Sequence, residues 1–506
     1  MRSDHEVLVV GAGPVGLTAA HELARRGIRV RVVDKATGPA TASRAMATHA
    51  RTLEICRQMG VLDDLLPRGR KVEHFTIHLR GRTLVRFDTD YSKLPTRYPF
   101  SLMVDQVVTE SVLRDSLSAL GVRVEWGIEL VSCVSREDGA DAELRPVGGQ
   151  VERHHYSWLV GADGAHSRVR KCLGLRLLGD STKTWLNADI QLPLDLPADS
   201  NHLVHHGRGT LLLVPFPQPG KWRVVDTEDT DHVDDIDLVT DRLADKLSRG
   251  FARAVAIPEP SWVSAFTVQQ RMIEKMRAGR CFVAGDAAHV HSPASGQGMN
   301  TGIQDAFNLS WKLADVLRGH AGEALLDSYE AERVPIGRAL LRSTRTATAL
   351  VSLRNAIAPV AMPAGLGLVR TVPALKRRLE AKLIRGFCGL ALSYPDSPLS
   401  VPALGSGPAP GDRLLLPFDL FDGRWVLLVF SDDNKLAGSG IRARYGHVVD
   451  LRAAGDPGLA GVSRGGYALV RPDGHLAAKG DRTDETVLEQ LFSRLHLLPD
   501  HGVRKE

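Results

Sequence analysis

The chain has 506 residues, of which 43% are hydrophobic and 24% charged, with a formal net charge of +5. This length predicts roughly three domains, and the interspersed, nearly balanced charge gives no reason to expect nucleic acid or anionic lipid as a partner. Five scattered cysteines without a C-x-x-C pair favour a reducing cytoplasm and argue against dithiol chemistry and structural zinc.

The N-terminus is charged and leads directly into an apolar run, so we expect no signal peptide. The longest uncharged stretch, residues 356–369, is too short to span a bilayer and contains two prolines. These features predict a cytoplasmic protein without an integral membrane segment.

The first elements along the chain form a strand–helix–strand unit. Residues 6–10 are a short apolar run, typical of a buried parallel strand, and residues 14–26 carry apolar side chains at helical spacing. A second β-branched run at 30–33 ends at Asp34. This pattern predicts the opening of a doubly wound α/β sheet.

The later elements alternate between sheet-rich and helical regions. We predict a hairpin at 74–88, strands within 184–192, 211–215 and 222–225, a return to helix over 287–317, a Pro/Gly/Ser-rich linker near 396–412, strands at 425–430 and 467–470, and a terminal helix from Asp484.

The turn after the first strand carries a phosphate-binding pattern, G-x-G-x-x-G. Gly11 permits a tight turn, Gly13 lets the backbone approach a pyrophosphate, and Gly16 lets the helix pack close to the strand. The helix N-terminus presents free N–H groups to phosphates. Asp34 can accept both ribose hydroxyls and would repel a 2′-phosphate. The unit therefore predicts a dinucleotide site for FAD or NAD, and not for NADP.

Two later segments select FAD. Each is an apolar strand that runs into a turn with a glycine and an aspartate: W-L-V-G-A-D-G at 158–164, and C-F-V-A-G-D at 281–286, which G-Q-G-M-N follows at 296–300. Asp286 is expected to hydrogen-bond a ribityl hydroxyl. Backbone N–H groups of 296–300 are expected to face the isoalloxazine edge. Each segment alone also suits an ordinary corner; the three motifs in this order indicate FAD.

In this order the motifs resemble those of the group A flavoprotein monooxygenases, which have the para-hydroxybenzoate hydroxylase-like fold. The resemblance covers about residues 5–345. It implies an α/β protein with a Rossmann-like FAD domain in three parts, 1–73, 98–176 and 276–395, the last including further helices. It also implies an interleaved substrate domain, formed by a hairpin at 74–97 and a sheet-rich region at 177–275.

The motifs and the resemblance together predict the cofactor-binding residues. These are Gly11, Gly13, Pro14, Gly16, Asp34, Lys35, Arg44, Gln106, Asp163, Gly164, Arg168, Gly285, Asp286, Pro293, Gly296, Gly298, Met299 and Asn300. Pro293 and Gly298 are expected nearest the reactive face of the flavin, where no side-chain nucleophile is needed. The substrate pocket is expected to be lined by the sheet domain, for example by Leu213, Pro215, Phe216 and Trp222, which would equally suit plain core.

The implied chemistry is that of a monooxygenase. NADPH or NADH visits transiently to reduce the flavin, because only one G-x-G-x-x-G is present; O2 then adds at flavin C4a, and the hydroperoxide transfers oxygen to a phenolic or polycyclic aromatic, polyketide-like ring. A Baeyer–Villiger oxygenase on the same scaffold is the alternative. The absence of W-x-W-x-I-P counts against a flavin-dependent halogenase, and the intact motifs argue against an inactive scaffold.

Residues 412–506, after a linker at 396–411, resemble the thioredoxin-like domain that follows the catalytic part of phenol hydroxylases and polyketide-tailoring hydroxylases. Because this segment lacks C-x-x-C, a role in packing or in homodimer formation is expected in place of redox chemistry. His289 and His291 lie in a proline-bounded turn without a nearby third ligand, so we interpret them as turn residues and predict no metal site.

Overall fold

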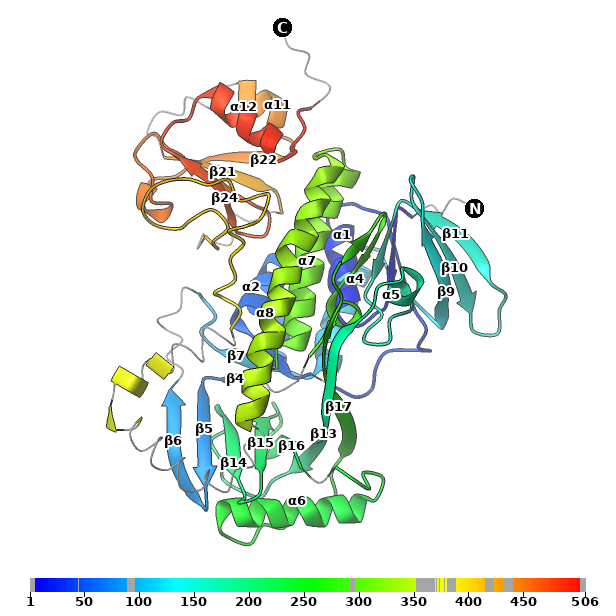
Figure 1. Cartoon of the computed structure of the whole chain (residues 1–506), viewed down its shortest axis with the longest axis vertical. Helices are drawn as coiled ribbons and strands as arrows, with labels where there is room; N and C mark the ends of the chain where they lie inside the picture. The colour runs from blue at the N-terminus through cyan, green and yellow to red at the C-terminus, as the bar shows by residue number, and fades with distance from the viewer. Residues whose placement is uncertain are drawn as a thin grey trace.

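The computed structural model describes residues 5–43, 45–88, 96–228, 230–291, 296–351, 388–414, 423–430 and 440–500, together with 369, 371–372, 374–376 and 378–379. From bottom to top, Figure 1 shows the helix α6 (Ile236–Phe251), a mixed sheet, the main body built on a mainly parallel sheet, and the C-terminal module. Among the described residues, no helix combines the length and the apolar character needed to cross a membrane.

The main body is built on a six-stranded sheet of order β18-β19-β12-β1-β2-β8, parallel except for the edge strand β18. Its strands are β1 (Val7–Val10), β2 (Val30–Asp34), β8 (Val124–Trp126), β12 (Trp158–Gly161), β18 (Arg277–Ala278) and β19 (Cys281–Val283). All residues of β1, β12 and β19 are buried, which is why these strands read as unbroken apolar runs. The strand–helix–strand unit predicted at the N-terminus is confirmed.

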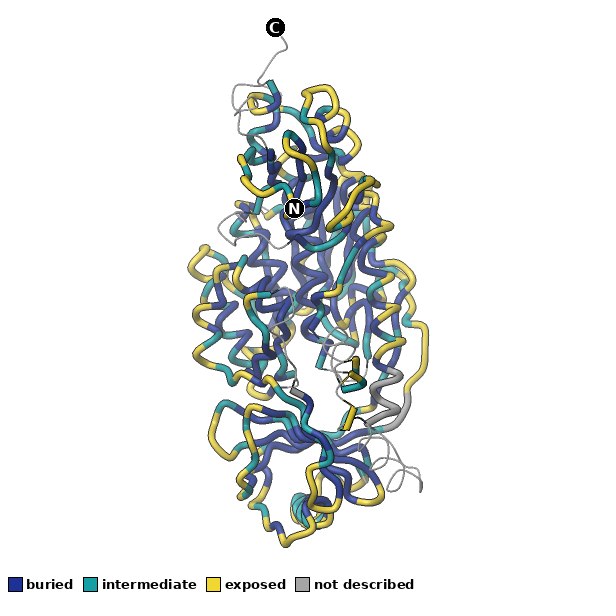
Figure 2. Tube along the Cα trace, turned by 90° about the vertical axis from the view of Figure 1, so that its left-hand side faces the viewer, coloured by how far each residue is buried: buried dark blue, intermediate teal, exposed yellow. Residues whose placement is uncertain are grey.

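Helices and two small sheets surround this parallel sheet. The helices are α1 (Pro14–Ala24), α2 (Ala50–Met59), α3 (Leu62–Leu65), α4 (Gln106–Ala119), α5 (Arg168–Cys172), α7 (Gly298–Leu317) and α8 (Asp327–Val351). One small sheet holds β9 (Ile128–Ser135), β10 (Ala140–Pro146) and β11 (Glu152–Tyr156), and the other β3 (Ala47–Thr48), β4 (Arg70–Val72) and β7 (Ser101–Met103). Helix α7 is buried from Met299 to Asp315, and Figure 2 shows the buried trace running through this part of the molecule.

The helix predicted over 287–317 begins eleven residues later than expected. Gly285 and Gly296 have φ angles of +60° and +62°, which a right-handed helix does not allow. Between them lie a 3-10 turn (η3, Gly285–Ala287) and a short strand (β20, His289–Val290) that pairs with β17. Tertiary pairing therefore overrides the helix propensity of the alanines at 287 and 288.

A second, eight-stranded sheet lies below the parallel sheet, in the order β20-β17-β13-β16-β15-β14-β5-β6. The predicted early hairpin forms, and its first strand pairs in parallel with β14 more than a hundred residues later, with His74 opposite Ser200. Its further strands are β5 (His74–Leu79), β6 (Arg82–Asp88), β13 (Leu178–Gln191), β14 (Ser200–His205), β15 (Thr210–Pro215), β16 (Lys221–Asp226) and β17 (Trp262–Met272).

The two faces of this sheet have different neighbours. One face packs against α6 (Ile236–Phe251), which contributes Val239, Leu243 and Leu247 to a core with Leu213 and Trp222. In both views α6 and the main body lie on opposite sides of the sheet. The face turned away from α6, which we call the inner face, carries Trp185, Leu203 and Val268, with Phe75, Ile77, Leu212, Val225 and Phe266 packed beside them.

In its described residues, the C-terminal module is a four-stranded mixed sheet with two α-helices. Its strands are β21 (Trp425–Val429), β22 (Val449–Ala453), β23 (Tyr467–Val470) and β24 (Leu476–Gly480), in the order β22-β21-β23-β24, and its helices are α11 (Gly440–Tyr445) and α12 (Glu485–Arg494). The terminal helix predicted from Asp484 begins at Glu485, and Asp484 caps it by accepting a hydrogen bond from the backbone N–H of Val487. The likeness to thioredoxin stays a prediction.

The Pro/Gly/Ser-rich stretch before this module packs, through its first residues, against both the main body and the module. Leu399 is buried, the backbone N–H of Val401 donates to the carbonyl of Ala477, and Ser397 Oγ donates to Glu332 of α8. Trp311 of α7 joins the core of the C-terminal module, with its ring centroid 5.6 Å from that of Trp425. The module therefore packs directly against the main body, and the stretch that joins them is not a fully solvated linker.

Candidate cofactor site

The three glycine-and-aspartate corners meet at one edge of the parallel sheet. Strands β19, β12, β1 and β2 are adjacent and parallel, so their carboxyl ends share that edge. Backbone hydrogen bonds continue past the strands: Gly11 N donates to Val33 O, Ala162 N to Val10 O, and Ala284 N to Gly161 O, at 2.8, 2.8 and 3.0 Å. The carboxyl edge of such a sheet is where α/β proteins bind ligands.

The first corner has the geometry that its three glycines predict. Gly11 has a φ of +107°, and a Cβ on Gly11 would collide with the carbonyl oxygen of Ala162. A Cβ on Gly16 would collide with the carbonyl oxygen of Gly11. A Cβ on Gly13 would instead meet nothing within 4 Å. Gly11 and Gly16 are therefore needed for packing inside the protein, whereas Gly13 borders space outside it. Pro14 is the first residue of α1.

Asp34 is held at this corner by backbone N–H groups. Its carboxylate accepts hydrogen bonds from Ala12 N at 2.7 Å and from Ala36 N at 2.8 Å. These bonds orient the carboxylate beside the glycine turn. Lys35 is exposed next to it.

In the middle corner, Asp163 was predicted to bind the cofactor, and its carboxylate is bonded to groups of the protein. The Asp163 carboxylate accepts hydrogen bonds from Ser167 Oγ and from the backbone N–H groups of Arg168 and Val169, so it caps the start of α5. Arg168 is exposed and its Nε donates to the carbonyl of Val131 at 2.7 Å. Gly164 has a φ of +75°, and a Cβ there would meet nothing within 4 Å. This corner thus offers open backbone at Gly164, while Asp163 shapes it.

The third corner presents an exposed aspartate on a buried turn. Asp286 is exposed, whereas Gly285 and Ala287 on either side of it are buried. The turn is held from below by Asp305 of α7, whose carboxylate accepts hydrogen bonds from Gly285 N at 3.1 Å and from His289 Nε2 at 2.6 Å. Burial alone would raise the pKa of Asp305, but the charges of Arg333 and His289 outweigh it and lower the pKa. Asp305 is therefore a buried carboxylate that anchors the Asp286 turn.

The start of α7 is tied to the segment around β3. Asn300 Nδ2 donates to the carbonyls of Ala47 and Gly296, and Asn300 Oδ1 accepts from the backbone N–H of His49, all at 2.8 Å. These bonds hold Gly296, Gly298 and the half-turn between them at the helix N-terminus, where backbone N–H groups lack intrahelical partners. Met299 is buried and packs in the main core.

Gln106 lies at the start of α4 and binds the segment that precedes β3. Its Oε1 accepts from Ala45 N at 3.1 Å, and its Nε2 donates to Glu110 Oε1 at 2.8 Å. Its carboxamide therefore positions the backbone next to Arg44. Arg44 and Pro293, both predicted to lie near the flavin, fall outside the described residues.

His289 and His291 do not share a ligand-binding geometry. The Nε2 atom of His289 is bonded to Asp305, and the two imidazole rings stack with their centroids 6.4 Å apart. Within the described part of the chain, no three His, Cys, Asp or Glu side chains gather in an arrangement that could hold a metal ion.

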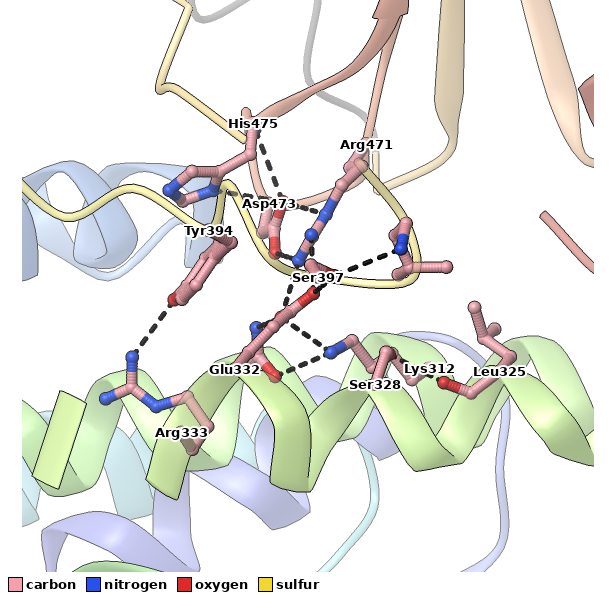
Figure 3. Close-up of polar contacts among 12 residues, drawn as sticks. Lys312, Leu325, Ser328, Glu332, Arg333, Tyr394, Ser397, Arg471, Asp473 and His475 are labelled. Carbon is pink, nitrogen blue, oxygen red and sulfur yellow. Dashed lines mark hydrogen bonds and ion pairs between the residues drawn. The ribbon is translucent and has the colours of Figure 1, made fainter. Parts of the chain in front are cut away.

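A buried polar network continues from the third corner to the C-terminal module. Arg333 Nε donates to Asp305 Oδ1 at 2.6 Å, and Arg333 Nη1 donates to the hydroxyl of Tyr394 at 3.0 Å. Figure 3 shows the adjacent cluster, in which Glu332 of α8 accepts hydrogen bonds from Lys312 of α7 and Arg471 of the module.

Within this cluster, burial and ion pairing have opposite effects on the pKa of each residue. Burial lowers the pKa of Lys312 to about 8, although Glu332 opposes the shift. Burial would raise the pKa of Glu332, but the charges of Arg471 and Lys312 lower it to about 2. Glu332 therefore stays ionised across the physiological pH range.

Three of the predicted substrate residues lie on the α6 face of the sheet, away from the main body. Leu213 and Trp222 are buried in the core beneath α6, and Pro215 lies directly opposite Trp222 in the strand register. These three residues are core, and the side chains that point toward the main body are their neighbours on the same strands, Leu212 and Val225. Phe216 follows β15 and is buried, with the guanidinium of Arg223 5.4 Å from its ring centroid.

Sequence reasoning missed three side chains that organise the corners: Arg170, Asp305 and Arg333. Arg170 Nη1 donates to the carbonyl of Ala287 at 3.1 Å and its Nη2 to the carbonyl of Ala165 at 2.9 Å, so it joins the middle and third corners. A usable signal was present for the α7 contact. Asp305, Asn308, Lys312 and Asp315 follow each other at spacings of three and four, which puts four polar side chains on one face of the helix.

The geometry of the edge suits FAD. Open space at Gly13 beside a helix N-terminus suits a pyrophosphate, the oriented Asp34 suits a ribose, and the exposed Asp286 on an anchored turn suits a polyol chain.

Comparisons with known proteins agree with this geometry. Residues 4–344 match the model of the FAD binding domain family. The chain is 58% identical to 6-methylpretetramide 4-monooxygenase from Streptomyces rimosus over 98% of its own length and 94% of that protein. OxyS anhydrotetracycline hydroxylase from Streptomyces rimosus is similar in structure, with a TM-score of 0.77 and 30% identity, covering 99% of this chain and 100% of that one. A ternary complex of aklavinone-11 hydroxylase with FAD and aklavinone has a TM-score of 0.80 and 27% identity, covering 98% and 99% of the two chains.

Proposed function

This chain belongs to the FAD binding domain family and is a flavin-dependent monooxygenase, and from that premise we propose that it hydroxylates a polycyclic aromatic substrate of the polyketide type. The observation that supports this proposal most directly is the convergence of three corners at one sheet edge, opposite a second sheet with an apolar inner face. Identity of 58% to a pretetramide monooxygenase makes 6-methylpretetramide the first substrate to test.

Each corner is assigned one part of FAD. The amides at the start of α1, next to Gly13, would bind the pyrophosphate, and Asp34 would accept hydrogen bonds from the adenosine ribose. Asp286 would accept from the ribityl chain. The N-terminus of α7, at Gly298, would present its N–H groups to the ring system and favour negative charge there. Bound FAD supplies hydride acceptance from NADPH or NADH and activation of O2.

The protein's own contribution is positioning and exclusion of water. Asn300 and Asp305 hold the α7 start and the Asp286 turn, so the residues that would meet the cofactor are preorganised. The half-buried apolar side chains of the inner face, such as Phe75, Ile77 and Phe266, would line the substrate pocket and keep it dry.

The cellular setting follows from the thiols and the reductant. All five cysteines are free, and four of them are buried. A chain with unpaired buried thiols that consumes NADPH or NADH fits the cytoplasm. The C-terminal module has no C-x-x-C and shares its core with α7, so its proposed role is structural.

The test is a turnover assay on the purified holoenzyme. FAD content is read from the visible absorption spectrum, and NADPH and NADH oxidation are followed with and without 6-methylpretetramide. Substrate-stimulated oxidation with a product heavier by one oxygen atom is expected. The proposal fails if the yellow enzyme shows no stimulation by this compound or by other polycyclic phenols.

Hydroxylation and Baeyer–Villiger insertion give products of the same mass, so the product must be examined by NMR. A new phenolic C–O bond with all rings unchanged in size is the expected result, in line with the named activity of 6-methylpretetramide 4-monooxygenase. A ring-expanded lactone would instead support the Baeyer–Villiger alternative.

A further inference from the structure

The polar side chains on the two faces of the eight-stranded sheet differ in how they are hydrogen-bonded. On the face that packs against α6, the polar groups are bonded to one another: Thr76 Oγ1 to Ser200 Oγ at 2.7 Å, His78 Nε2 to His202 Nδ1 at 2.8 Å, and His202 Nε2 to the carbonyl of Pro197 at 2.9 Å. These pairs satisfy their hydrogen bonds within the protein.

Three buried polar atoms on the inner face lack such partners in the described part of the chain. Trp185 Nε1, Asn187 Oδ1 and Arg223 Nη1 are buried, and none has a hydrogen-bond partner among the described residues. The side chains of Trp185, Asn187 and Arg223 are only 1%, 7% and 4% exposed. Asn187 is two residues beyond Trp185 on β13, so both point to the same face, and Arg223 lies opposite Asp189 on the neighbouring strand β16.

One nitrogen of the Arg223 guanidinium, Nη1, lacks a hydrogen-bond partner within the described residues, while Asp189 balances the charge of the guanidinium. Its Nε and Nη2 donate to the two carboxylate oxygens of Asp189 at 2.7 and 2.8 Å. Its guanidinium lies 5.4 and 4.8 Å from the ring centroids of Phe216 and Trp262. This clamp fixes the guanidinium plane while Nη1 remains unbonded.

Buried polar atoms without partners are rare in folded proteins, because each loses its bonds to water and gains nothing in return. Three of them on the adjacent strands β13 and β16 therefore indicate a partner from outside the chain. Two are donors, Trp185 Nε1 and Arg223 Nη1, and the third is the carboxamide of Asn187. Their complement is a flat apolar ligand that carries acceptor oxygens and at least one hydroxyl.

We propose that Asn187, with Trp185 and Arg223, is the specificity determinant of the substrate pocket and recognises the keto and hydroxyl oxygens of a polycyclic ring. The inference rests on the proposed function, since it takes the inner face as the substrate face. A pocket of this composition rejects an unsubstituted ring more strongly than an apolar pocket would, because such a ring leaves all three groups without partners.

The test measures binding to the oxidised, FAD-loaded enzyme, with no turnover required. The probes are 1,8-dihydroxyanthraquinone, which carries keto and hydroxyl oxygens, and anthracene, which carries neither. Dissociation constants come from perturbation of the flavin absorption band, and FAD affinity is measured separately. The variants are Asn187→Leu and Trp185→Phe. Trp222→Phe is the matched control, because it makes the same change on the α6 face of the same sheet.

We expect wild type to prefer the dihydroxyanthraquinone. Asn187→Leu and Trp185→Phe should each weaken its binding by about tenfold, the effect of one lost hydrogen bond, and leave anthracene binding unchanged or tighter. Trp222→Phe should leave the dissociation constants of both probes unchanged. FAD affinity should stay within twofold of wild type in all three variants.

A second measurement separates a ligand-binding role from a structural one. Because Asn187 has no partner in the free protein, Asn187→Leu should raise the thermal unfolding midpoint of the ligand-free holoenzyme by a few degrees. A lowered midpoint with unchanged probe binding would mean that the carboxamide serves the fold, and would overturn the assignment. Asn187→Ala provides the same binding comparison if leucine prevents folding.

Binding of the two rings distinguishes an error in the proposed substrate class from an error in the role given to Asn187. A wild-type holoenzyme that binds neither ring overturns the proposed substrate class and this assignment with it. A wild-type enzyme that binds the dihydroxyanthraquinone, with Asn187→Leu binding it equally well, overturns this assignment alone.

Discussion

Arg471 donates hydrogen bonds to both carboxylate oxygens of Glu332, at 2.7 and 2.9 Å, across the boundary between the C-terminal module and helix α8 (Figure 3). Lys312 and Asp473 complete the cluster, so two buried cations face two buried carboxylates. The cluster is neutral as a set, and this balance makes its members interdependent.

Removing Arg471 should strongly destabilise the protein. Arg471→Leu leaves Glu332 and Asp473 buried with only Lys312 to balance them, and breaking a buried pair in this way costs about 3–5 kcal/mol. The measurement is urea unfolding of the holoenzyme. Arg145→Leu is the control, since Arg145 pairs with Glu129 at the surface, where such pairs contribute about 0–1 kcal/mol. Similar losses in the two variants would contradict the role given to the cluster.

Two glycines of the same turn should respond differently to alanine. Gly13→Ala adds a methyl group to open space at a φ of −75°, so the apoprotein should keep its stability while FAD affinity falls at least about tenfold. Gly16→Ala should instead prevent correct folding, because the new Cβ meets the Gly11 carbonyl. FAD titration and thermal unfolding of the apoproteins separate the two effects. A stable Gly13→Ala protein with normal FAD affinity would refute the placement of the pyrophosphate.

The exposed and the buried aspartate of the third corner provide a second contrast. Asp286→Asn should weaken FAD binding with little change in stability, because Asp286 is exposed and is assigned to the cofactor. Asp305→Asn should lower both, since it leaves Arg333 and His289 without their buried anion and loosens the Gly285 turn. Equilibrium FAD titration and urea unfolding are run on both variants. Loss of stability in Asp286→Asn equal to that in Asp305→Asn would argue against this division.

The histidine pair of the second sheet predicts acid sensitivity. Burial, with a smaller effect of His202, lowers the pKa of His78 to about 4 from its usual 6.5. The unfolded chain therefore binds more protons between pH 4 and 6.5, so stability is complete above pH 6.5 and falls as the pH drops through this window. His78→Gln should reduce the loss of the thermal midpoint between pH 7.5 and 5.0. His166→Gln, at an exposed position, should show the wild-type loss.

Local geometry could be predicted from the sequence at each corner. The spacing of Gly11, Gly13 and Gly16 after an apolar strand, and of Asp34 at the end of the next one, depends only on backbone conformation within one strand–helix–strand unit. The order of the three motifs was sufficient to indicate a flavin enzyme, and the family comparison confirms it.

Tertiary structure decided what the aspartates and the sheet faces do. Asp163 caps α5 and Asp286 is exposed, although the two sit in similar motifs, because only the packed fold determines which N–H groups lie nearby. Residues 211–214 read Leu-Leu-Leu-Val, so no alternation of polar and apolar side chains marks which face is inward. A shift of one residue exchanges the two faces of a strand, and here one face packs against α6 while the other is the face that we propose binds the substrate. The sequence therefore determined which chemistry the chain supports, while the strand register and helix packing decided which side chains face α6 and which face the main body.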